Sequence, residues 1–204
     1  MIRALICDLG NVLLHFDHRL ISQRLARHLP GKHWDERREA DFWPLAHAFE
    51  RGSIDSASFL DQASALLETG QSLSNEEFRL LWADIFWPNA PLIDLLAGLR
   101  DDIRLVMLSN TNALHIDFAR ESFPELFAVF HDTVFSFEQG SAKPDEAIYR
   151  VALDRAQVEA GEALYIDDIA AYVDAATALG MHSYQYVSLE GIRDVLRLHA
   201  VLQK

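Results

Sequence analysis

The chain has 204 residues, enough for one domain or for one domain with a substantial insertion. Half of the residues are hydrophobic and 24% are charged, which is typical of a globular protein with a well-filled core. With 18 basic and 31 acidic side chains the formal net charge is −13, so we expect no nucleic-acid partner. No run approaches the ~18 to 20 uninterrupted apolar residues of a membrane span, and the start of the chain does not resemble a signal peptide.

The first predicted strand, residues 2–7, ends in the single cysteine, Cys7, and is followed directly by Asp8. One cysteine cannot form an internal disulfide, so we expect a cytoplasmic protein. Because Cys7 lies in an apolar strand, we interpret it as an inert buried thiol. Asp8 is the more informative residue, since a carboxylate at the tip of a buried strand needs a reason.

Residues 16–87 contain no convincing strand and several helices. Apolar residues recur at helical spacing over 19–29, 57–67 and 74–86, and Ser74 and Glu77 have the spacing of a capping box. Ordinary crossover helices would explain one or two such segments. Roughly seventy helical residues after the first strand instead predict a cap over the strand ends. We therefore assign residues 1–15 and 88–204 to the core and 16–87 to the cap.

Four further strands are predicted at residues 103–109, 132–137, 163–167 and 182–187. Helical periodicity separates them at residues 112–121, 145–157, 170–179 and 189–202, and Gly180 is placed to end the third of these helices. Continuous apolar strands that alternate with helices indicate parallel strands covered on both faces. The sequence therefore predicts an α/β fold, a Rossmann-like doubly wound sheet of five core strands, which binds ligands at the carboxyl ends of its strands.

Polar residues follow two of these strands in addition to Asp8. Ser109 ends the second strand, with Asn110, Thr111 and Asn112 after it, and a hydroxyl beside a helix N-terminus suits an anionic oxygen. Taken alone, these residues are better explained as turn formers and helix caps.

Two other motifs carry charge to the same edge. In "SAKPDEAIY", Lys143 precedes Pro144, a helix-start residue, and can bring a positive charge into an acidic site. In "LYIDD", Asp167 and Asp168 end a buried strand, where paired carboxylates repel each other and lose hydration. A divalent cation would neutralise them, and carboxylate oxygens with open positions suit Mg²⁺.

Together these residues predict one mechanism. Asp8 would attack phosphorus and form an aspartyl-phosphate, which water then hydrolyses. Magnesium would offset the repulsion between carboxylate and phosphate, Lys143 would add a second positive charge, and Ser109 would hold a phosphoryl oxygen.

The motifs "DLGNVL", "LSNTN", "SAKP" and "YIDD", in this order and spacing, resemble the haloacid dehalogenase-like hydrolase superfamily over essentially the whole chain. The "DLGNV" variant is most similar to the bacterial α-D-glucose-1-phosphate phosphatase group. The resemblance implies a Rossmann-like core with a helical cap inserted after the first strand. It makes Asp8 the nucleophile and a Mg²⁺ ligand, with Asp168, the neighbouring Asp167 and the backbone carbonyl of Gly10 as the rest of the metal site. It further implies that Ser109 and Asn110 bind phosphate and that Lys143 bridges phosphate and nucleophile.

The sequence departs from this pattern at two positions. Most phosphatases of the superfamily carry a general acid two residues after the nucleophile, where this chain has Gly10. A missing acid is least harmful when the leaving oxygen is already acidic, as in a sugar 1-phosphate; otherwise His15, Asp17 or a water would supply the proton. Tyr172 replaces the small polar residue that relatives often have four residues after the second Asp.

The substrate-selecting residues are expected in the cap. The candidates are Trp43, His47, Phe49, Glu50, Arg51 and Trp87.

The leading hypothesis is thus a Mg²⁺-dependent phosphatase that acts on a small phosphorylated metabolite. A metal-independent 2-haloacid dehalogenase would also use Asp attack, although Asp167–Asp168 argue against it. A catalytically weak metabolite-binding homologue is the third alternative. The sequence leaves the substrate open, and also the choice between monomer and homodimer.

Overall fold

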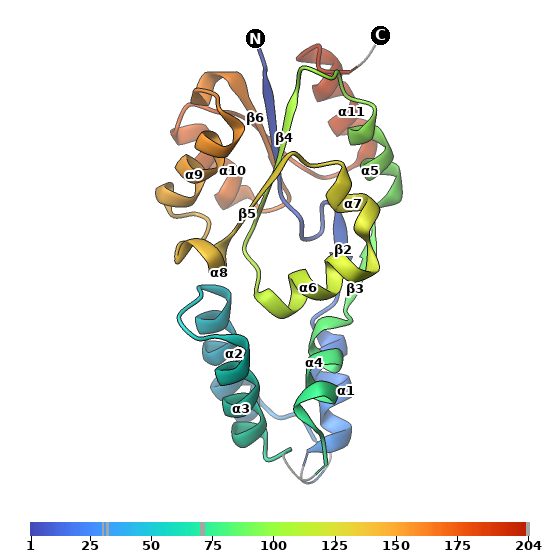
Figure 1. Cartoon of the computed structure of the whole chain (residues 1–204), viewed down its shortest axis with the longest axis vertical. Coiled ribbons are helices and arrows are strands. Elements are labelled where there is room, and N and C mark those ends of the chain that lie inside the picture. The colour runs from blue at the N-terminus through green and yellow to red at the C-terminus, as the bar shows by residue number, and fades with distance from the viewer. Residues whose placement is uncertain (30, 32, 70–71, 203–204) are drawn as a thin grey trace.

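The computed structural model describes residues 1–29, 31, 33–69 and 72–202. Its centre is a five-stranded parallel sheet in the order β5–β4–β1–β6–β7 (Figure 1). The strands are β1 (Ala4–Cys7), β4 (Arg104–Ser109), β5 (Asp132–Phe135), β6 (Ala163–Asp167) and β7 (His182–Gln185). The α/β fold and all five predicted strands are confirmed, and four of the strands differ from the predicted range by one or two residues at one end.

Helices cover both faces of this sheet (Figure 1). On β1, Leu5 and Cys7 pack against one helical layer, whereas Ala4 and Ile6 pack against the other. This alternation is the two-residue period of a strand. The first layer consists of α5 (Ala90–Ala97), α6 (Ala113–Ser122), α7 (Pro124–Ala128) and α11 (Leu189–Leu198). The second consists of α9 (Glu146–Ala156) and α10 (Ala170–Ala178), and Gly180 follows α10 with a φ of 91°, as expected for a helix end.

The register of the three central strands sets the position of the site. Cys7, the last residue of β1, is paired with Met107 of β4 on one side and with Ile166 of β6 on the other. The next residue, Asp8, therefore leaves the sheet beside the ends of both neighbours, and its N–H donates to the Ile166 carbonyl at 2.9 Å. One carboxyl edge thus gathers residues that are far apart in the sequence.

The segment after β1 folds as a helical cap next to this edge (Figure 1). Its helices are α1 (Arg19–Leu25), the 3₁₀ turn η1 (Ala26–His28), α2 (Glu36–Glu50), α3 (Ser56–Leu67) and α4 (Asn75–Ala83). Phe42, Phe59 and Trp82 are fully buried at the centre of the cap and contact one another. The capping box of Ser74 and Glu77 is present. The cap therefore has a hydrophobic core of its own.

Two short strands were not expected. β2 (Leu14–Phe16) and β3 (Phe86–Pro88) form an antiparallel ribbon where the chain enters and leaves the cap, so the expectation of no strand over 16–87 is wrong. Each strand has three residues, too few to show an alternating pattern, and each finds its partner about seventy positions away. The helix α2 also escaped individual prediction, because its charged first turns and Pro44 obscure the apolar stripe.

A buried histidine joins the core to the cap. His115 of α6 stacks on Trp82 of α4, with 5.0 Å between ring centroids and an interplanar angle of 13°. Its Nε2 lies 3.2 Å from the Trp82 carbonyl oxygen, and its Nδ1 lies 3.1 Å from Nδ2 of Asn112. A carbonyl only accepts, so Nε2 carries the proton and Nδ1 accepts from the amide. Burial lowers the pKa of His115 to about 3, and the ring is neutral.

A second joint lies at the end of α2. Gly52 has a φ of 69°, and a Cβ built on it would lie 2.1 Å from the carbonyl oxygen of Phe137 in α8 (Ser136–Gln139). Arg51, next to it, forms an ion pair with Asp145 at 3.3 Å. The turn after α2 therefore packs backbone against backbone on the core.

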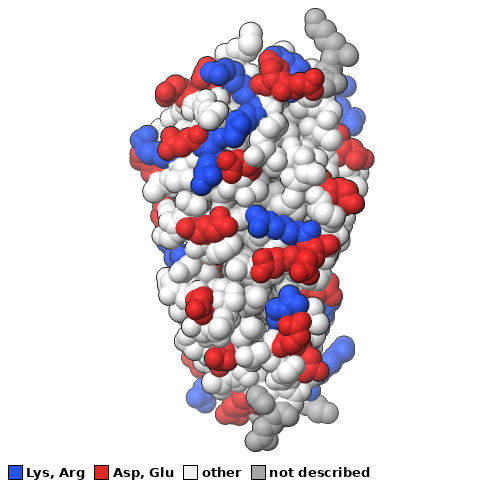
Figure 2. Space-filling model, in the orientation of Figure 1, with Lys and Arg blue, Asp and Glu red and all other residues white. Residues whose placement is uncertain are grey.

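The surface carries both signs of charge, and on the face in Figure 2 acidic and basic side chains are interspersed. Within the described residues, every helix is too short or too polar to traverse a lipid bilayer.

We expect Gly52→Ala to lower the free energy of unfolding more than Gly140→Ala does. Gly140 also has a positive φ, 62°, but nothing lies within 4 Å of its Cβ position. Gly140→Ala should therefore cost about 1 to 2 kcal/mol from backbone conformation alone, whereas the Phe137 contact adds roughly 1 to 3 kcal/mol of overpacking to Gly52→Ala. Chemical denaturation measures both, and equal losses would show that the cap turn is not held against the core.

We expect acid to weaken the His115 joint. The folded pKa, about 3, lies below the unfolded value of 6.5, so this contribution to stability is complete above pH 6.5 and is lost as the pH falls toward 3. Between pH 6.5 and 5 the loss is about 2 kcal/mol. The difference between wild type and His115→Gln, measured by denaturation across this range, isolates the effect, and the exposed His33→Gln is the control. A constant difference between wild type and His115→Gln would contradict the assignment.

Candidate active site

The centre of the site is a lysine buried between two carboxylates. Nζ of Lys143 lies 2.7 Å from Oδ1 of Asp8 and 2.6 Å from Oδ2 of Asp167, and also donates to the Leu108 carbonyl oxygen at 3.3 Å. Burial alone would lower the pKa of Lys143, but Asp8 and Asp167 more than offset it and raise the pKa above the ordinary value. The residue is a permanent cation at the carboxyl edge of the sheet.

Both carboxylate oxygens of Asp167 accept hydrogen bonds from the protein. Besides Lys143, its Oδ2 accepts from the Tyr165 hydroxyl, and its Oδ1 accepts from the backbone N–H of Ile169 at 2.9 Å. Tyr165 and Asp167 are two residues apart on β6 and point to the same side of the strand. Asp167 therefore anchors the lysine, and Tyr165 is a supporting residue that sequence reasoning missed, although the two-residue spacing was visible.

One carboxylate oxygen of Asp8 accepts from Lys143, and the Asp8 side chain faces the cavity described below. Burial raises its pKa to about 7; Lys143 acts against this shift, and Asp167 and Asp168 add to it. An anionic carboxylate is thus costly here without further positive charge. That cost is what a bound cation would remove.

The acidic cluster suits a hard divalent cation. Carboxylate oxygens of Asp8, Asp167 and Asp168 all lie within 4.8 Å of one another. Asp168 is half-buried, and burial followed by the charge of Asp167 raises its pKa. Both oxygens of Asp167 already accept hydrogen bonds from the protein, so Asp8 and Asp168 could bind a metal more readily than Asp167. Oxygen donors of this kind fit Mg²⁺, which retains several waters in such sites.

The loop after β4 holds Lys143 from the other side. The Asn110 amide accepts from the Lys143 backbone N–H at 2.8 Å and donates to the Lys143 carbonyl at 2.9 Å. It also donates to the Tyr172 hydroxyl at 3.3 Å, and the Tyr172 ring centroid lies 5.0 Å from Nζ of Lys143. Tyr172, which departs from the usual pattern of relatives, therefore supports the lysine. The Asn110 side chain serves the same purpose, so any phosphate contact from Asn110 would come from its backbone.

Ser109 and Asn112 have separate tasks in this loop. Ser109 is buried, and its hydroxyl makes a long contact of 3.5 Å with the Asn110 carbonyl. Asn112 caps α6 by accepting from the His115 N–H at 3.1 Å. On the far side of Lys143, Pro144 lies before the helix rather than in its first turn, because α9 begins at Glu146 with Asp145 as the preceding cap residue.

A cavity of about 170 Å³ opens above these groups. Six of the seven residues predicted for the site line it, and Asp167 is buried behind Lys143. The remaining lining residues are Asn11, Phe16, Ile169 and Tyr172. Asn11 has a φ of 54°, a turn conformation in which Asn is common, and Phe16 belongs to the ribbon that enters the cap. The core and the ribbon together enclose the cavity.

Six cap residues were proposed to face the site, and two of them, Phe49 and Trp87, lie elsewhere. Phe49 stacks on Phe59 inside the cap, with 4.5 Å between centroids, so its proposed role is wrong. Trp87 is 46% exposed and pairs with His15 on the face of the ribbon opposite Phe16, so it points away from the cavity. The other four belong to α2 and the turn after it: Trp43, His47, Glu50 and Arg51.

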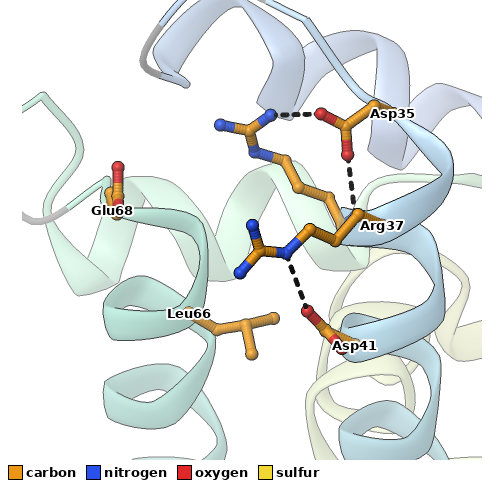
Figure 3. A pocket seen from close by; sticks show the side chains of 6 residues that line it. Asp35, Arg37, Asp41, Leu66 and Glu68 are labelled. Carbon is orange, nitrogen blue, oxygen red and sulfur yellow. Dashed lines mark hydrogen bonds and ion pairs between the residues drawn. The ribbon is translucent and has the colours of Figure 1, made fainter.

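A second crevice, of about 330 Å³, lies at the opposite end of α2 (Figure 3). Its arginines face acidic neighbours: Arg37 lies 3.9 Å from Asp41 and Arg38 lies 2.8 Å from Asp35. Since α2 has 15 residues and rises about 1.5 Å for each, this crevice is about 20 Å from the core end of the helix. It is separate from the carboxyl edge of the sheet.

Residues 2–180 match the haloacid dehalogenase-like hydrolase family, and the chain belongs to it. It is 25% identical over 193 residues to the D-ribitol-5-phosphate phosphatase of Bacteroides thetaiotaomicron, covering 91% of this chain and 92% of that protein. A HAD family enzyme of that organism, solved with magnesium and inorganic phosphate, has a TM-score of 0.80 at 25% identity, covering 93% of this chain and 96% of that one. A HAD-like family hydrolase from Porphyromonas gingivalis has a TM-score of 0.80 at 28% identity, covering 97% and 98%.

The chain is therefore a hydrolase with a phosphatase among its homologues. The predicted cofactor agrees with the magnesium bound in the homologous structure and with the three aspartates at the edge of the sheet. The narrower resemblance to glucose-1-phosphate phosphatases is not reflected in these relatives.

We expect Lys143→Met to be strongly destabilising, because it leaves two buried carboxylates without their cation. The loss should be about 3 to 5 kcal/mol at pH 8, and it should shrink as the pH falls and the carboxylates become protonated. Denaturation at pH 8 and at pH 5.5 measures this trend, with the exposed Arg193→Met as the control. A loss that does not depend on pH would contradict the ion-pair account.

Proposed function

We propose that this protein is a magnesium-dependent phosphatase that hydrolyses a small phosphorylated metabolite through an aspartyl-phosphate on Asp8. The observation that carries the proposal is the buried Lys143, which bridges Asp8 and Asp167 beneath a cavity lined by Ser109 and Asp168. This arrangement concentrates positive charge and a carboxylate nucleophile in the same small volume. Attack by a carboxylate on a phosphate dianion needs that combination.

In the proposed mechanism, each residue acts at a defined place. Lys143 fixes one oxygen of Asp8, which leaves the other to attack phosphorus in line with the leaving oxygen. The Lys143 ammonium and the Ser109 hydroxyl stabilise negative charge on the transferring group, with backbone N–H groups of the 109–112 loop beside them. Tyr172 and Asn110 keep the lysine in position.

Asp8 and Asp168 would hold the magnesium ion, together with the backbone carbonyl of Gly10 and with Asp167 behind them. Bound there, the ion supplies positive charge that offsets repulsion between carboxylate and phosphate. Water then hydrolyses the aspartyl-phosphate, and Asp8 is restored.

For the substrate we propose a small phosphorylated sugar or sugar alcohol. Gly10 favours an acidic leaving oxygen, as in a sugar 1-phosphate, because it provides no side chain for proton donation. Similarity to a ribitol-5-phosphate phosphatase favours a primary-alcohol phosphate instead. A panel of phosphorylated metabolites, assayed by phosphate release with Mg²⁺, decides between the two.

We expect Asp8→Asn to reduce phosphate release by at least about a thousandfold, since an amide cannot replace the nucleophile. The fold should persist, because Asn keeps the shape of the side chain and Lys143 keeps Asp167 as its partner. Turnover and thermal unfolding test both statements, with Asp94→Asn on the exposed face of α5 as the matched control. Turnover close to wild type in Asp8→Asn would refute the nucleophile.

We expect EDTA to abolish phosphatase activity and added Mg²⁺ to restore it. A metal-independent 2-haloacid dehalogenase would instead release halide in the presence of EDTA, so the same experiment on a 2-haloacid discriminates the two enzymes. A binding homologue without activity would retain metabolite affinity while releasing neither phosphate nor halide.

A further inference from the structure

The cavity above Asp8 is lined by the core and by the ribbon that leads into the cap. Its lining residues come from the loops after β1, β4, α8 and β6, from α10, and from Phe16 of β2. Of the described residues that line it, none belongs to the cap helices α1 to α4. The groups that select a substrate within this cavity are therefore sought in the core and in the ribbon.

One part of the lining is charged or polar and serves the phosphoryl group in the proposed reaction. Lys143 and Ser109 face the transferring group, and Asp8 and Asp168 would hold the metal ion, together with the carbonyl of Gly10. When a phosphate ester binds with its phosphoryl group among these residues, its alcohol part has to extend toward the rest of the lining.

Three lining residues are left for the alcohol part of the ester, because Asn110 and Tyr172 already hold the lysine. They are Asn11, Phe16 and Ile169. Ile169 is 43% exposed and Asn11 is exposed as well, so these two residues lie where the cavity opens to solvent. Phe16 is half-buried. It is the aromatic wall that the alcohol meets inside the cavity.

The Phe16 ring lies edge-on against the backbone that follows the nucleophile. A Cβ built on Gly10 would lie 2.8 Å from Cε1, 3.6 Å from Cδ1 and 3.8 Å from Cζ of this ring. The ring edge therefore comes close to the chain two residues after Asp8, and it narrows the cavity on this side.

Neighbouring side chains fix the position of the Phe16 ring. Phe16 pairs with Phe86 in the register of the ribbon, and the two rings meet edge to face with 6.1 Å between centroids. The ring of His18 lies 4.7 Å from that of Phe16. Asn89, which follows β3, donates its backbone N–H to the Leu13 carbonyl at 2.9 Å and so fastens the ribbon to the loop after β1. The wall is thus held by the core side of the molecule.

The cavity is small, with a volume of about 170 Å³. Pockets that bury a drug-sized ligand usually have about 300 to 1,000 Å³, so this one has room for a phosphoryl group and the first atoms of the alcohol. A primary alcohol places a narrow CH₂ group next to the ester oxygen. In a sugar 1-phosphate the carbon next to that oxygen belongs to the sugar ring, so the ring itself would have to fit beside Phe16.

Resting on the phosphatase function proposed above, we propose that Phe16 is a specificity-determining residue that admits phosphate esters of primary alcohols and disfavours esters whose phosphate is attached directly to a sugar ring. The CH₂ group of a primary ester passes along the edge of the Phe16 ring, and hydroxyl groups farther along the chain reach the Asn11 amide and solvent. A sugar ring in that place displaces Phe16, and the contacts with Phe86 and His18 oppose the displacement. The site thereby selects the width of the alcohol next to the bond that breaks.

The test uses two pairs of isomers that differ only in where the phosphate is attached: glucose 6-phosphate with α-D-glucose 1-phosphate, and ribose 5-phosphate with α-D-ribose 1-phosphate. In wild type, kcat/KM should be higher for the primary esters. Phe16→Leu removes the ring and keeps an apolar side chain against Phe86. It should raise kcat/KM for the 1-phosphates by about tenfold or more, because steric exclusion of this kind is relieved when the side chain shrinks. For the primary esters kcat/KM should change by less than about threefold.

Trp87→Leu is the matched control, since it removes an aromatic ring from the opposite face of the same ribbon. It should leave the ratio of kcat/KM between the isomers as in wild type. Thermal unfolding establishes that each variant is folded, and Phe16→Met, which keeps more of the side-chain volume, replaces Phe16→Leu if the latter does not fold.

Two results would overturn the role of Phe16: the same isomer ratio in Phe16→Leu as in wild type, or a wild type that is faster on the 1-phosphates. Release of phosphate by wild type from other esters, but from neither pair, would also overturn it. In each of these cases hydrolysis by wild type leaves the phosphatase function standing. If wild type with Mg²⁺ releases phosphate from no ester, the function and the role of Phe16 fall together.

Discussion

The ammonium group of Lys143 is the contact around which the rest of the site is arranged. It lies between Asp8 and Asp167, which enter from the neighbouring strands β1 and β6, and it reaches them from a loop more than 130 residues after Asp8. Two buried carboxylates would repel each other at this edge without it. The surrounding residues are arranged accordingly: Asn110 fixes the lysine backbone from both sides, and Tyr172 covers its side chain.

This arrangement explains which parts of the site could be predicted from the sequence. Strands of continuous apolar residues specify a buried parallel sheet, and parallel strands bring their carboxyl ends to one edge. Asp8, Ser109 and Asp167 each end or follow such a strand, so their proximity follows from the pattern alone. The sequence does not show which of Asp167 and Asp168 holds the lysine and which faces the cavity. That difference depends on the Asp167 oxygens that accept from Tyr165 and from the Ile169 N–H.

Other features depend on contacts that no local pattern records. The strands β2 and β3 are three residues each and owe their existence to each other across the whole cap. Phe16 reads as an ordinary aromatic residue, yet its ring edge would lie 2.8 Å from a Cβ at position 10. Glu50 reads as a solvated charge at a helix end, yet its carbonyl accepts from the Ser136 hydroxyl where the cap meets the core, and burial raises the pKa of its carboxyl to about 7. Such features combine segments that are independent in the sequence, so they require the three-dimensional structure.

The ribbon of β2 and β3 also affects which changes to the cap evolution can make in this fold. The chain leaves the core and returns to it at adjacent, hydrogen-bonded positions, where Phe16 faces Phe86. The chain between those two residues is covalently connected to the core at this ribbon, and the cap fills its own hydrophobic interior. A cap of another length could therefore be inserted at the same ribbon and leave the carboxyl edge of the sheet intact. The cap and the sheet edge are, in this sense, separately heritable parts of one chain.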